Sequence, residues 1–326
     1  MTALADRSIL VTGGSGSFGH AFVRRALAAG ARRVVVFSRD ELKQSVMARE
    51  ISDPRVRYFV GDVRNRDRLR LALQGVEVVI HAAAMKRIEV CEAEPCEAVE
   101  TNVIGTQNVA LESIRAGVQR AVFLSTDKAP AAHTLYGMTK AVAERLWLMC
   151  NVYAAGGATL LSATRYGNVI GSRGSVLSLF RSQCQAREPL TVTREAATRF
   201  WMTMPEAVAL VELALREMRG GELFIPKIGS ATVLDLARAV VGPAFYEPGH
   251  VETGLRPGER IHETLITEDE ARHTYDAGSH YVVEPEARSW GAAPERALPM
   301  VPEGFSYRSD TNAQQLTVEE LRRMAA

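Results

Sequence analysis

The amino-acid sequence predicts an α/β protein built on a doubly wound parallel sheet of the Rossmann type, followed by a smaller C-terminal domain. Short apolar runs alternate with helical patterns through the first half of the chain. A glycine-rich loop separates the first run from the first helix. At 326 residues and 47% hydrophobic, the chain has room for two moderate domains. We expect one over residues 1–168 and another over 169–326, with about 200–228 packing back on the first.

The first predicted strand, Ser8–Thr12, runs into a loop with glycines at positions 13, 16 and 19. This spacing permits a tight turn, close approach of the backbone to a pyrophosphate, and packing of the next helix on the strand. A plain turn is the alternative. The residues predicted to hold a dinucleotide here are Gly13, Gly16, Ser17, Phe18 and Gly19.

The second predicted strand, Arg33–Phe37, ends where this fold reads the adenosine ribose. An acid here, such as Asp40, would bond to the ribose 2'-hydroxyl of NAD. Arg39, supported by Ser38 and Lys43, would instead pair with the 2'-phosphate of NADP. The sequence favours NADP, and Asp40 keeps NAD as the alternative.

Three further strands are predicted at Val56–Val60, Glu77–His81 and Arg120–Ser125, with helices from about Asn65 and over Asn102–Ala116. Strands separated by helices imply parallel pairing through right-handed crossovers. Residues after the third and fourth strands therefore lie at the cofactor edge. Those predicted to contact the cofactor are Asp62 and Val63, near the adenine, and the small residues Ala82, Ala83 and Ala84.

The segment from Ser125 to Lys140 holds the densest set of reactive side chains. Tyr136 and Lys140 are four residues apart, so on a helix they share one face. A neighbouring ammonium favours the phenolate of a tyrosine, which titrates near about 10 when free. Tyr136 is therefore a candidate base toward a sugar hydroxyl, although such a pair also occurs by chance on a helix surface.

Charge and cysteine usage limit the classes of partner. A net charge of +1 provides no field for nucleic acid or an anionic membrane. The four cysteines form no CxxC pair and no metal-ligand spacing with the seven histidines, so we expect no metal and no disulfide framework. A reducing cytoplasm is predicted. The first predicted strand starts at Ser8, so we expect no signal peptide.

One passage resembles a membrane span in length. Leu146 to Thr164 contains no charged residue. Polar residues and the Gly156-Gly157 pair interrupt it, and we interpret it as a helix end, a Gly-Gly turn and a new strand.

The second half contributes three loops with arginines. Arg173 lies in a glycine-rich loop, Arg199 precedes two aromatic residues, and Arg256 opens an Arg-Pro-Gly-Glu run. Bidentate guanidinium contacts match phosphate oxygens, so the three would suit a diphosphate and a nucleotide base. Solvated surface arginines are the alternative for each one.

Together these motifs resemble a known family. Thr12–Gly19, with Tyr136 and Lys140, resembles the extended short-chain dehydrogenases/reductases that act on nucleotide sugars. Nearly the whole chain, to Ser309–Asn312, is similar to the inverting UDP-N-acetylglucosamine 4,6-dehydratases. The segments that carry this second similarity are Ser38–Gln44, His81–Lys86, Ser125–Ala129, Arg165–Val169, Thr198–Trp201 and Arg256–Glu259.

The resemblance implies a lyase that uses NADP to convert UDP-GlcNAc into a 4-keto-6-deoxy sugar nucleotide inverted at C5. Tyr136 would take the C4 hydroxyl proton, with Thr126 orienting that hydroxyl and Lys140 supporting Tyr136. Lys128 would remove the C5 hydrogen and Asp127 would help expel the C6 hydroxyl as water. This assignment requires that the pair lie past the strand end and that the pKa of Lys128 be lowered.

The resemblance also implies further binding residues and self-association as a dimer or hexamer. To the cofactor contacts it adds Lys86, Asn102, Val169, Tyr136 and Lys140. For the substrate it implies Lys86, Asn168, Arg173, Gly174, Ser175, Val176, Arg199, Arg256 and Glu259.

The sequence departs from the family pattern close to the predicted sugar site. Ala131–Thr134 stands where relatives carry Asn-Pro-x-Asn, and Met85 and Arg87 replace Leu and His. His133 is either an additional acid or base or a loop residue. A C4 epimerase and a retaining 4,6-dehydratase stay open, although an epimerase needs no Asp127-Lys128 pair for elimination. An NADP-binding sensor is the alternative of another class.

Overall fold

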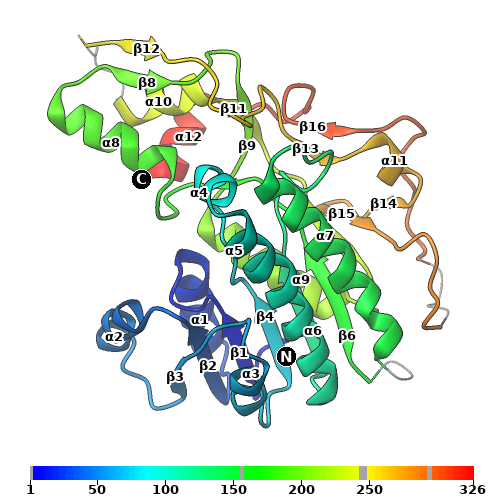
Figure 1. Cartoon of the computed structure of the whole chain (residues 1–326). Coiled ribbons are helices and arrows are strands. Elements are labelled where there is room, and N and C mark those ends of the chain that lie inside the picture. Colours follow the sequence, from blue (N-terminus) through cyan, green and yellow to red (C-terminus); the bar gives the residue numbers. More distant parts are fainter. Residues whose placement is uncertain (1–2, 155–157, 242–247, 292–295) are drawn as a thin grey trace.

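The computed structural model describes residues 3–154, 158–241, 248–291 and 296–326. Its largest element is a nine-stranded sheet (Figure 1) in the order β14-β15-β10-β6-β5-β4-β1-β2-β3. Strands β1 to β6 and β10 are parallel, and β15 and β14 are antiparallel additions at one edge. The strands are β1 (Ser8–Thr12), β2 (Arg33–Ser38), β3 (Val56–Val60), β4 (Val78–His81), β5 (Arg120–Leu124), β6 (Leu160–Thr164), β10 (Leu223–Pro226), β14 (Thr274–Asp276) and β15 (His280–Val283).

Helices cover both faces of this sheet. Buried residues of α1 (Ser17–Ala28), α2 (Glu41–Glu50) and α9 (Met204–Glu217) form a core on one face, and those of α3 (Arg66–Ala72), α6 (Gly105–Arg115) and α7 (Leu135–Met149) form a core on the other. Two short helices, α4 (Ile88–Ala93) and α5 (Pro95–Val99), and a π-helical turn at Glu100–Ile104 precede α6. The fold class predicted from the sequence is confirmed.

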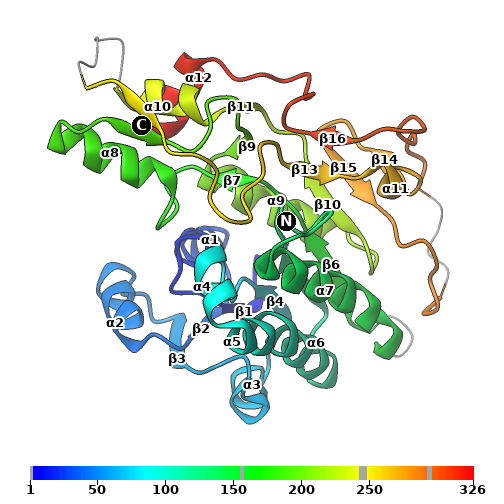
Figure 2. The ribbon, with the colours of Figure 1, turned by 45° about the horizontal axis from the view of Figure 1, so that its top comes forward.

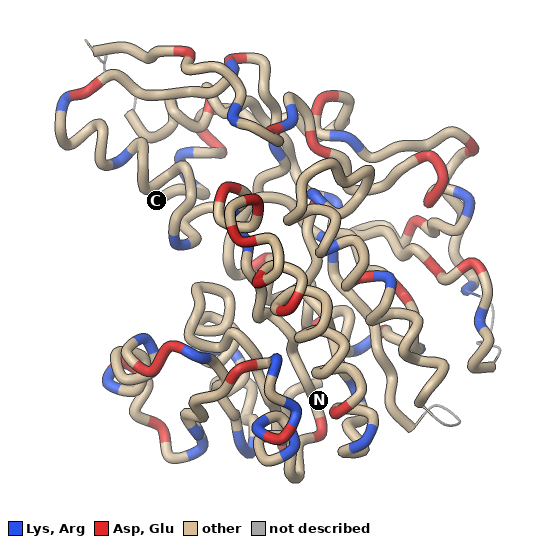
Figure 3. The backbone as a smooth tube through the Cα atoms, in the orientation of Figure 1, with Lys and Arg blue, Asp and Glu red and all other residues tan. Residues whose placement is uncertain are grey.

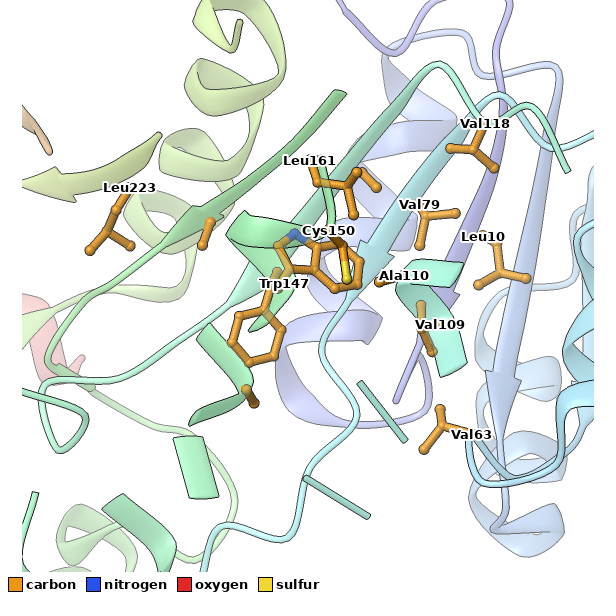
Figure 4. Close-up of a cluster of buried hydrophobic side chains, with 14 of the residues drawn as sticks. Leu10, Val63, Val79, Val109, Ala110, Val118, Trp147, Cys150, Leu161 and Leu223 are labelled. Atoms are coloured by element: carbon orange, nitrogen blue, oxygen red, sulfur yellow. The ribbon is translucent and has the colours of Figure 1, made fainter. Parts of the chain in front are cut away.

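The apolar strands form because both of their faces are buried. In β1, Ile9 and Val11 pack into the core below α1 and α9, whereas Leu10 packs into the opposite core. Figure 4 shows Trp147 of α7 beside Leu161 of β6 in this second core. The fully buried Trp147 indole donates from Nε1 to the Ser162 carbonyl at 3.0 Å, which anchors α7 to the sheet.

Element boundaries follow the predictions closely for the first strands. β1 and β3 have the predicted bounds, and Asn65 is the N-cap of α3, where its side chain accepts from the backbone N–H of Arg68. The single helix predicted over Asn102–Ala116 is wrong at its start, because residues 100–104 form a π-helical turn before α6 begins. The periodicity of the sequence does not distinguish these two helical forms.

The C-terminal part has its own core, formed by α8 (Val176–Ala186), α10 (Val233–Val241) and α12 (Val318–Ala325). Figures 1 and 2 show these three helices together at one end of the molecule, above α1 and α2. The remaining elements are β7 (Asn168–Val169), β9 (Thr198–Met202) and β11 (Ser230–Thr232) in one sheet, the pairs β8 (Leu190–Val192) with β12 (His250–Glu252) and β13 (Thr264–Ile266) with β16 (Tyr307–Arg308), and α11 (Glu268–Ala271).

The chain crosses between the two parts more often than the sequence indicated. In the structure α9 packs against α1, and β10 pairs with β6. Both α9 and β10 lie within residues 200–228. Strands β15 and β14 also extend the large sheet, although we assigned their residues wholly to the second domain. Their short antiparallel pairing depends on β10 offering a free edge, which local sequence does not reveal.

The uncharged passage from Leu146 to Thr164 is divided as predicted between a helix end and a strand. Helix α7 ends at Met149, a 3-10 turn covers Cys150–Tyr153, and β6 begins at Leu160. The predicted Gly-Gly turn lies outside the described residues. No helix in the described ranges is long and apolar enough to cross a bilayer. Figure 3 shows basic and acidic residues interleaved along α2 and α3.

A buried arginine joins the helix that carries Tyr136 to the C-terminal part. The Arg165 guanidinium, 3% exposed, donates to Glu144 of α7 at 2.5 Å, to Glu270 of α11 at 2.8 Å and to the Leu265 carbonyl at 2.8 Å. Burial lowers the pKa of Arg165, but the two carboxylates raise it by more. The carboxylates of Glu144 and Glu270 therefore share the guanidinium of Arg165 as their positive partner.

Replacing Arg165 with methionine is expected to lower the free energy of unfolding by about 3–5 kcal/mol, because Glu144 and Glu270 would lose their buried partner. Arg272→Met is the matched control, since Arg272 pairs with Asp269 on the exposed surface and should cost less than about 1 kcal/mol. Denaturant unfolding measures both variants. Equal losses in the two variants would contradict a bracing role for Arg165.

Candidate active site

The candidate site lies at the carboxyl edge of the parallel sheet, where loops after adjacent strands meet. Gly13, with φ of +64°, backs onto the loop after β4, so a Cβ there would lie 2.8 Å from the Ala83 nitrogen. A Cβ on Gly19 would lie 2.4 Å from the Gly14 Cα. Only glycine fits at these two positions, as the predicted turn and helix packing require.

The first turn of α1 presents backbone N–H groups at the same edge. Its N-cap is Gly16, and no side chain among the described residues caps it. Uncapped N–H groups and the positive end of the helix dipole suit a phosphate. The loop around Arg173 lies beside this turn, because the Arg173 N–H donates to Ser17 Oγ at 3.0 Å and its Nη1 to the Ser15 carbonyl at 3.3 Å.

The two charged residues directly after β2, Arg39 and Asp40, differ in how far their side chains are engaged by the protein. Asp40 caps α2 by accepting from the Lys43 N–H at 2.9 Å, and its carboxylate lies 2.5 Å from Lys43 Nζ. The hydrogen bond from Lys43 lowers the pKa of Asp40. Arg39 is 51% exposed and lies 3.7 Å from Asp62. The Asp40 carboxylate is thus already bound to Lys43 of α2, whereas the Arg39 guanidinium faces solvent. The Ser38 side chain is buried and accepts from Ser15 at 2.9 Å.

The loop after β4 is held by an asparagine. Asn102 accepts from the Met85 N–H at 2.8 Å and donates to the Met85 carbonyl at 2.9 Å. Lys86 then reaches the Arg173 carbonyl at 3.2 Å, and burial lowers its pKa. Val63, by contrast, is buried against Gly105, and the backbone of Ala82 and Ala83 lies against Gly13.

Thr126, Asp127 and Lys128 lie just past the end of β5, as their predicted roles require. Asp127 is 2% exposed, and its Oδ1 accepts from Thr126 Oγ1 at 3.0 Å and from Lys128 Nζ at 2.9 Å. Glu263, 3% exposed, lies 3.4 Å from the same Lys128 Nζ. The lysine therefore contacts two buried carboxylates.

This placement corrects the expected state of Lys128. The proposed base needed a lowered pKa. Burial does lower the pKa of Lys128, but Asp127 and Glu263 raise it by more, and the result lies above the ordinary lysine value. In this arrangement Lys128 is an ammonium, and it must lose a proton before it can act as a base.

Tyr136 and Lys140 lie on the same buried face of α7, as the spacing predicted. The expected lowering of the phenol pKa is wrong for this structure, because burial raises the pKa of Tyr136 while a hydrogen bond to Thr126 and the charge of Lys128 oppose the rise. Lys140 instead donates to the Leu124 carbonyl at 2.7 Å, and burial lowers its pKa to about 7.

The predicted substrate residues fall into two groups. Ser175 is the N-cap of α8 and Val176 its first residue, preceded by Gly174 with φ of +74°; Asn168 and Val169 form β7 beside β9. These residues lie near Arg173 in sequence, and Arg173 itself reaches the glycine-rich loop through Ser15 and Ser17.

Arg199 departs from its predicted role as a free phosphate contact. It is 6% exposed, and its guanidinium donates to the Thr198 and Ile261 carbonyls at 2.8 and 3.0 Å and to Glu259 at 2.8 Å. Glu259 also accepts from the Arg256 N–H at 3.2 Å. Arg199 therefore braces the turn at 256–259, and Arg256 itself is exposed.

Sequence reasoning missed two residues beside the site. Glu263 follows the Arg-Pro-Gly-Glu run closely, but only folding brings it to Lys128. Arg260 contacts the loop that departs from the family pattern, donating to His133 Nδ1 and to the Pro130 carbonyl, both at 3.0 Å, and to the Ala131 carbonyl. His133 is thus part of a contact between loops. The sequence signal that could have indicated this contact is the arginine that directly follows Glu259.

Residues 9–285 match the family described as polysaccharide biosynthesis protein. The chain belongs to this family. No group of His, Cys, Asp and Glu in the described ranges is arranged to hold a metal ion, and the four cysteines are free thiols.

Relatives in and around this family confirm the resemblance found in the sequence. The chain is 39% identical over 325 residues to UDP-N-acetylglucosamine 4,6-dehydratase (inverting) of Campylobacter jejuni serotype O:23/36, covering 97% of this chain and 96% of that protein. It is 34% identical over 329 residues to UDP-glucose 4-epimerase of Rickettsia akari, covering 98% and 95%. The X-ray structure of Pen from Bacillus thuringiensis superposes with a TM-score of 0.90 at 34% identity, covering 98% and 97%.

Proposed function

We propose that the chain is a lyase that converts UDP-GlcNAc to a UDP-4-keto-6-deoxy-N-acetylhexosamine, with inversion at C5. The observation that carries this proposal is the contact between the buried Asp127 and the partly buried Lys128, beside Tyr136 at the carboxyl edge of the sheet. Elimination of water across C5 and C6 needs an acid and a base at one place. The 39% identity to an inverting dehydratase over nearly the whole chain supports this substrate and outcome.

We further propose NADP as the cofactor. The uncapped first turn of α1, the glycine turn and the exposed Arg39 beside an occupied Asp40 support this choice. A bound nicotinamide would supply the acceptor and later the donor of a hydride, which lets the sugar be oxidised and reduced without net redox change. Asn102, Lys86 and Lys140 would complete the walls of the cofactor site.

The side chains then divide the acid–base work. Tyr136 must be a phenolate to accept the C4 hydroxyl proton, and the hydrogen bond to Thr126 and the charge of Lys128 favour that form. Thr126 also orients the hydroxyl. The resulting 4-keto group acidifies the C5 hydrogen, which Lys128 removes. Asp127 must first be protonated. Its Oδ2, which has no hydrogen-bond partner among the described residues, can carry the proton that it then donates to the departing C6 hydroxyl. Residues 169–326, through Arg173–Val176 and the turn at Arg256–Glu259, are proposed to hold the UDP-sugar.

A C4 epimerase is the second candidate. The 34% identity to a protein named UDP-glucose 4-epimerase over 98% of this chain favours it. An epimerase returns the hydride to C4 and forms no bond to solvent hydrogen at C5. The two reactions therefore leave different marks on the product.

The proposed reaction is tested with UDP-GlcNAc in deuterated water, with the sugar followed by NMR. The expected product is a 4-keto-6-deoxy sugar with deuterium at C5 and L-arabino coupling constants, because Lys128 removes the C5 hydrogen and C5 is reprotonated from the opposite face with hydrogen that comes from solvent. A D-xylo product would overturn the inversion. A C4 epimer without deuterium would establish the epimerase, and unchanged sugar with NADP bound would indicate a binding or sensor role.

The cofactor preference is tested by Arg39→Ala. Loss of a charge-assisted contact to the 2'-phosphate is expected to weaken NADP binding by about 10–100-fold and to leave NAD binding nearly unchanged. Titration calorimetry with both dinucleotides measures the effect, and Arg49→Ala, at an exposed position of α2, is the control. Equal weakening of NAD and NADP would contradict the assignment of Arg39.

Self-association as a dimer or hexamer and residence in a reducing cytoplasm stay predictions. Four free thiols are compatible with the second, and sedimentation velocity of the purified chain measures the first.

A further inference from the structure

We propose that Glu263 acts through Lys128, holding its amine in place and accepting its proton so that the amine can serve as the C5 base. This inference rests on the proposed function, because it assigns a partner to a residue of the same site. Glu263 belongs to the C-terminal part of the chain, immediately before β13, and reaches the site only through the fold.

The geometry brings the carboxylates of Glu263 and Asp127 to the same Lys128 ammonium. Glu263 Oε1 lies 3.4 Å from Lys128 Nζ, and Asp127 Oδ1 lies 2.9 Å from the same atom. Both carboxylates are almost fully buried. Within the described residues, neither Glu263 Oε2 nor Asp127 Oδ2 has a hydrogen-bond partner. Each acid therefore keeps one buried oxygen free to accept or hold a proton.

The position of Glu263 is fixed from behind by a backbone network. Its N–H donates to Ser309 Oγ at 2.9 Å, and its carbonyl accepts from the Ser309 N–H at 2.9 Å. Ser309 Oγ in turn lies 2.7 Å from Thr198 Oγ1. These contacts hold the main chain and leave the carboxylate directed at Lys128, as expected of a residue that positions another.

The charged groups around Glu263 support a proton that can move between Lys128 and this carboxylate. The groups that face Glu263 are Lys128, Asp127, Arg199 and Arg260. Arg199 pairs with Glu259 at 2.8 Å, and its Nε also lies 3.8 Å from Glu263 Oε1. Arg260 contacts the loop at 130–133. Lys128 lies closer to Glu263 Oε1, at 3.4 Å, and it also contacts Asp127. Burial raises the pKa of Glu263, although Lys128 opposes this, so the carboxylate has an increased affinity for a proton.

Substrate binding would exclude water from this cluster and penalise separated charges. Moving a proton from Lys128 Nζ to a Glu263 oxygen converts the ion pair into a neutral amine and a carboxylic acid. The N–H bond breaks as the O–H bond forms. The free electron pair on Nζ then forms a bond to the C5 proton, and the C5–H electrons enter the enolate of the 4-keto sugar. A 3.4 Å separation shortens readily when a site closes.

The first test needs no substrate. Lys128 in the intact chain is labelled with cyanate at a series of pH values, and mass spectrometry of its peptide gives the rate. Glu263→Gln removes a neighbouring negative charge, so Lys128 should react on the order of tenfold faster at a fixed pH. Glu268→Gln, on exposed α11, is the matched control and should leave the rate unchanged. An unchanged rate in Glu263→Gln would overturn the interaction.

The second test uses UDP-GlcNAc and NADP. Glu263→Gln is expected to retain reduction of the nicotinamide, because C4 oxidation depends on Tyr136, and to lose C5 deuterium incorporation by about 10²–10⁴-fold. Glu263→Asp keeps an acid and should recover part of the exchange. Loss of nicotinamide reduction and C5 exchange in equal measure would indicate a structural role only and would overturn the proposal.

The two tests separate this inference from the proposed function. If the wild-type chain forms no keto sugar, the proposed function fails, and the cyanate rates still decide whether Glu263 controls Lys128. If the wild type is active and Glu263→Gln exchanges C5 at the wild-type rate, the inference fails and the dehydratase assignment stands. Thermal unfolding of each variant confirms that it is folded.

Discussion

The ammonium of Lys128 between the carboxylates of Asp127 and Glu263 is the contact on which the rest of the structure depends. Buried charges are stable only when they are paired and held. Asp127 and Lys128 come from the edge of the large sheet, and Glu263 comes from the C-terminal part. The cluster therefore forms only when both parts are folded against each other. Arg165, which bonds to acids from α7 and α11, makes a second charged link between the same two parts.

Burial gives this site its chemistry as well as its stability. A phenol and an amine in water hold their protons firmly at neutral pH, and the same groups in a dry pocket respond to their neighbours. Burial raises the pKa of Tyr136 and favours its neutral phenol, whereas the hydrogen bond to Thr126 and the charge of Lys128 lower that pKa. Lys140 is shifted toward neutrality, its pKa lowered to about 7. A ligand that brings or removes charge at this edge would thus change the protonation states of several side chains together. A reaction that oxidises a sugar, eliminates water and reduces the product requires such changes.

Features set by local sequence could be predicted, and those set by distant contacts could not. The glycine turn and the strand ends follow from short-range sterics and apolar periodicity, and so does the placement of Asp127 and Lys128 past β5. The charge state of Lys128 was not predicted, because the adjacent Asp127 turns its carboxylate onto the amine only in the folded chain and Glu263, which adds to its effect, lies far away in the sequence. Arg199 was predicted as a free phosphate contact, but its acceptors in the folded protein come from the turn beyond residue 256. The edge strands β14 and β15 likewise depend on a partner that appears only after folding.

The central claim is that one site oxidises C4, eliminates water across C5 and C6, and reduces C6. UDP-GlcNAc carrying deuterium at C4 tests it most directly, with mass spectrometry and NMR locating the label after turnover. Our account predicts a keto sugar with the deuterium at C6, because the hydrogen removed from C4 is returned there. Deuterium retained at C4 of an epimerised sugar would contradict the account, since no elimination would then have separated the oxidation from the reduction.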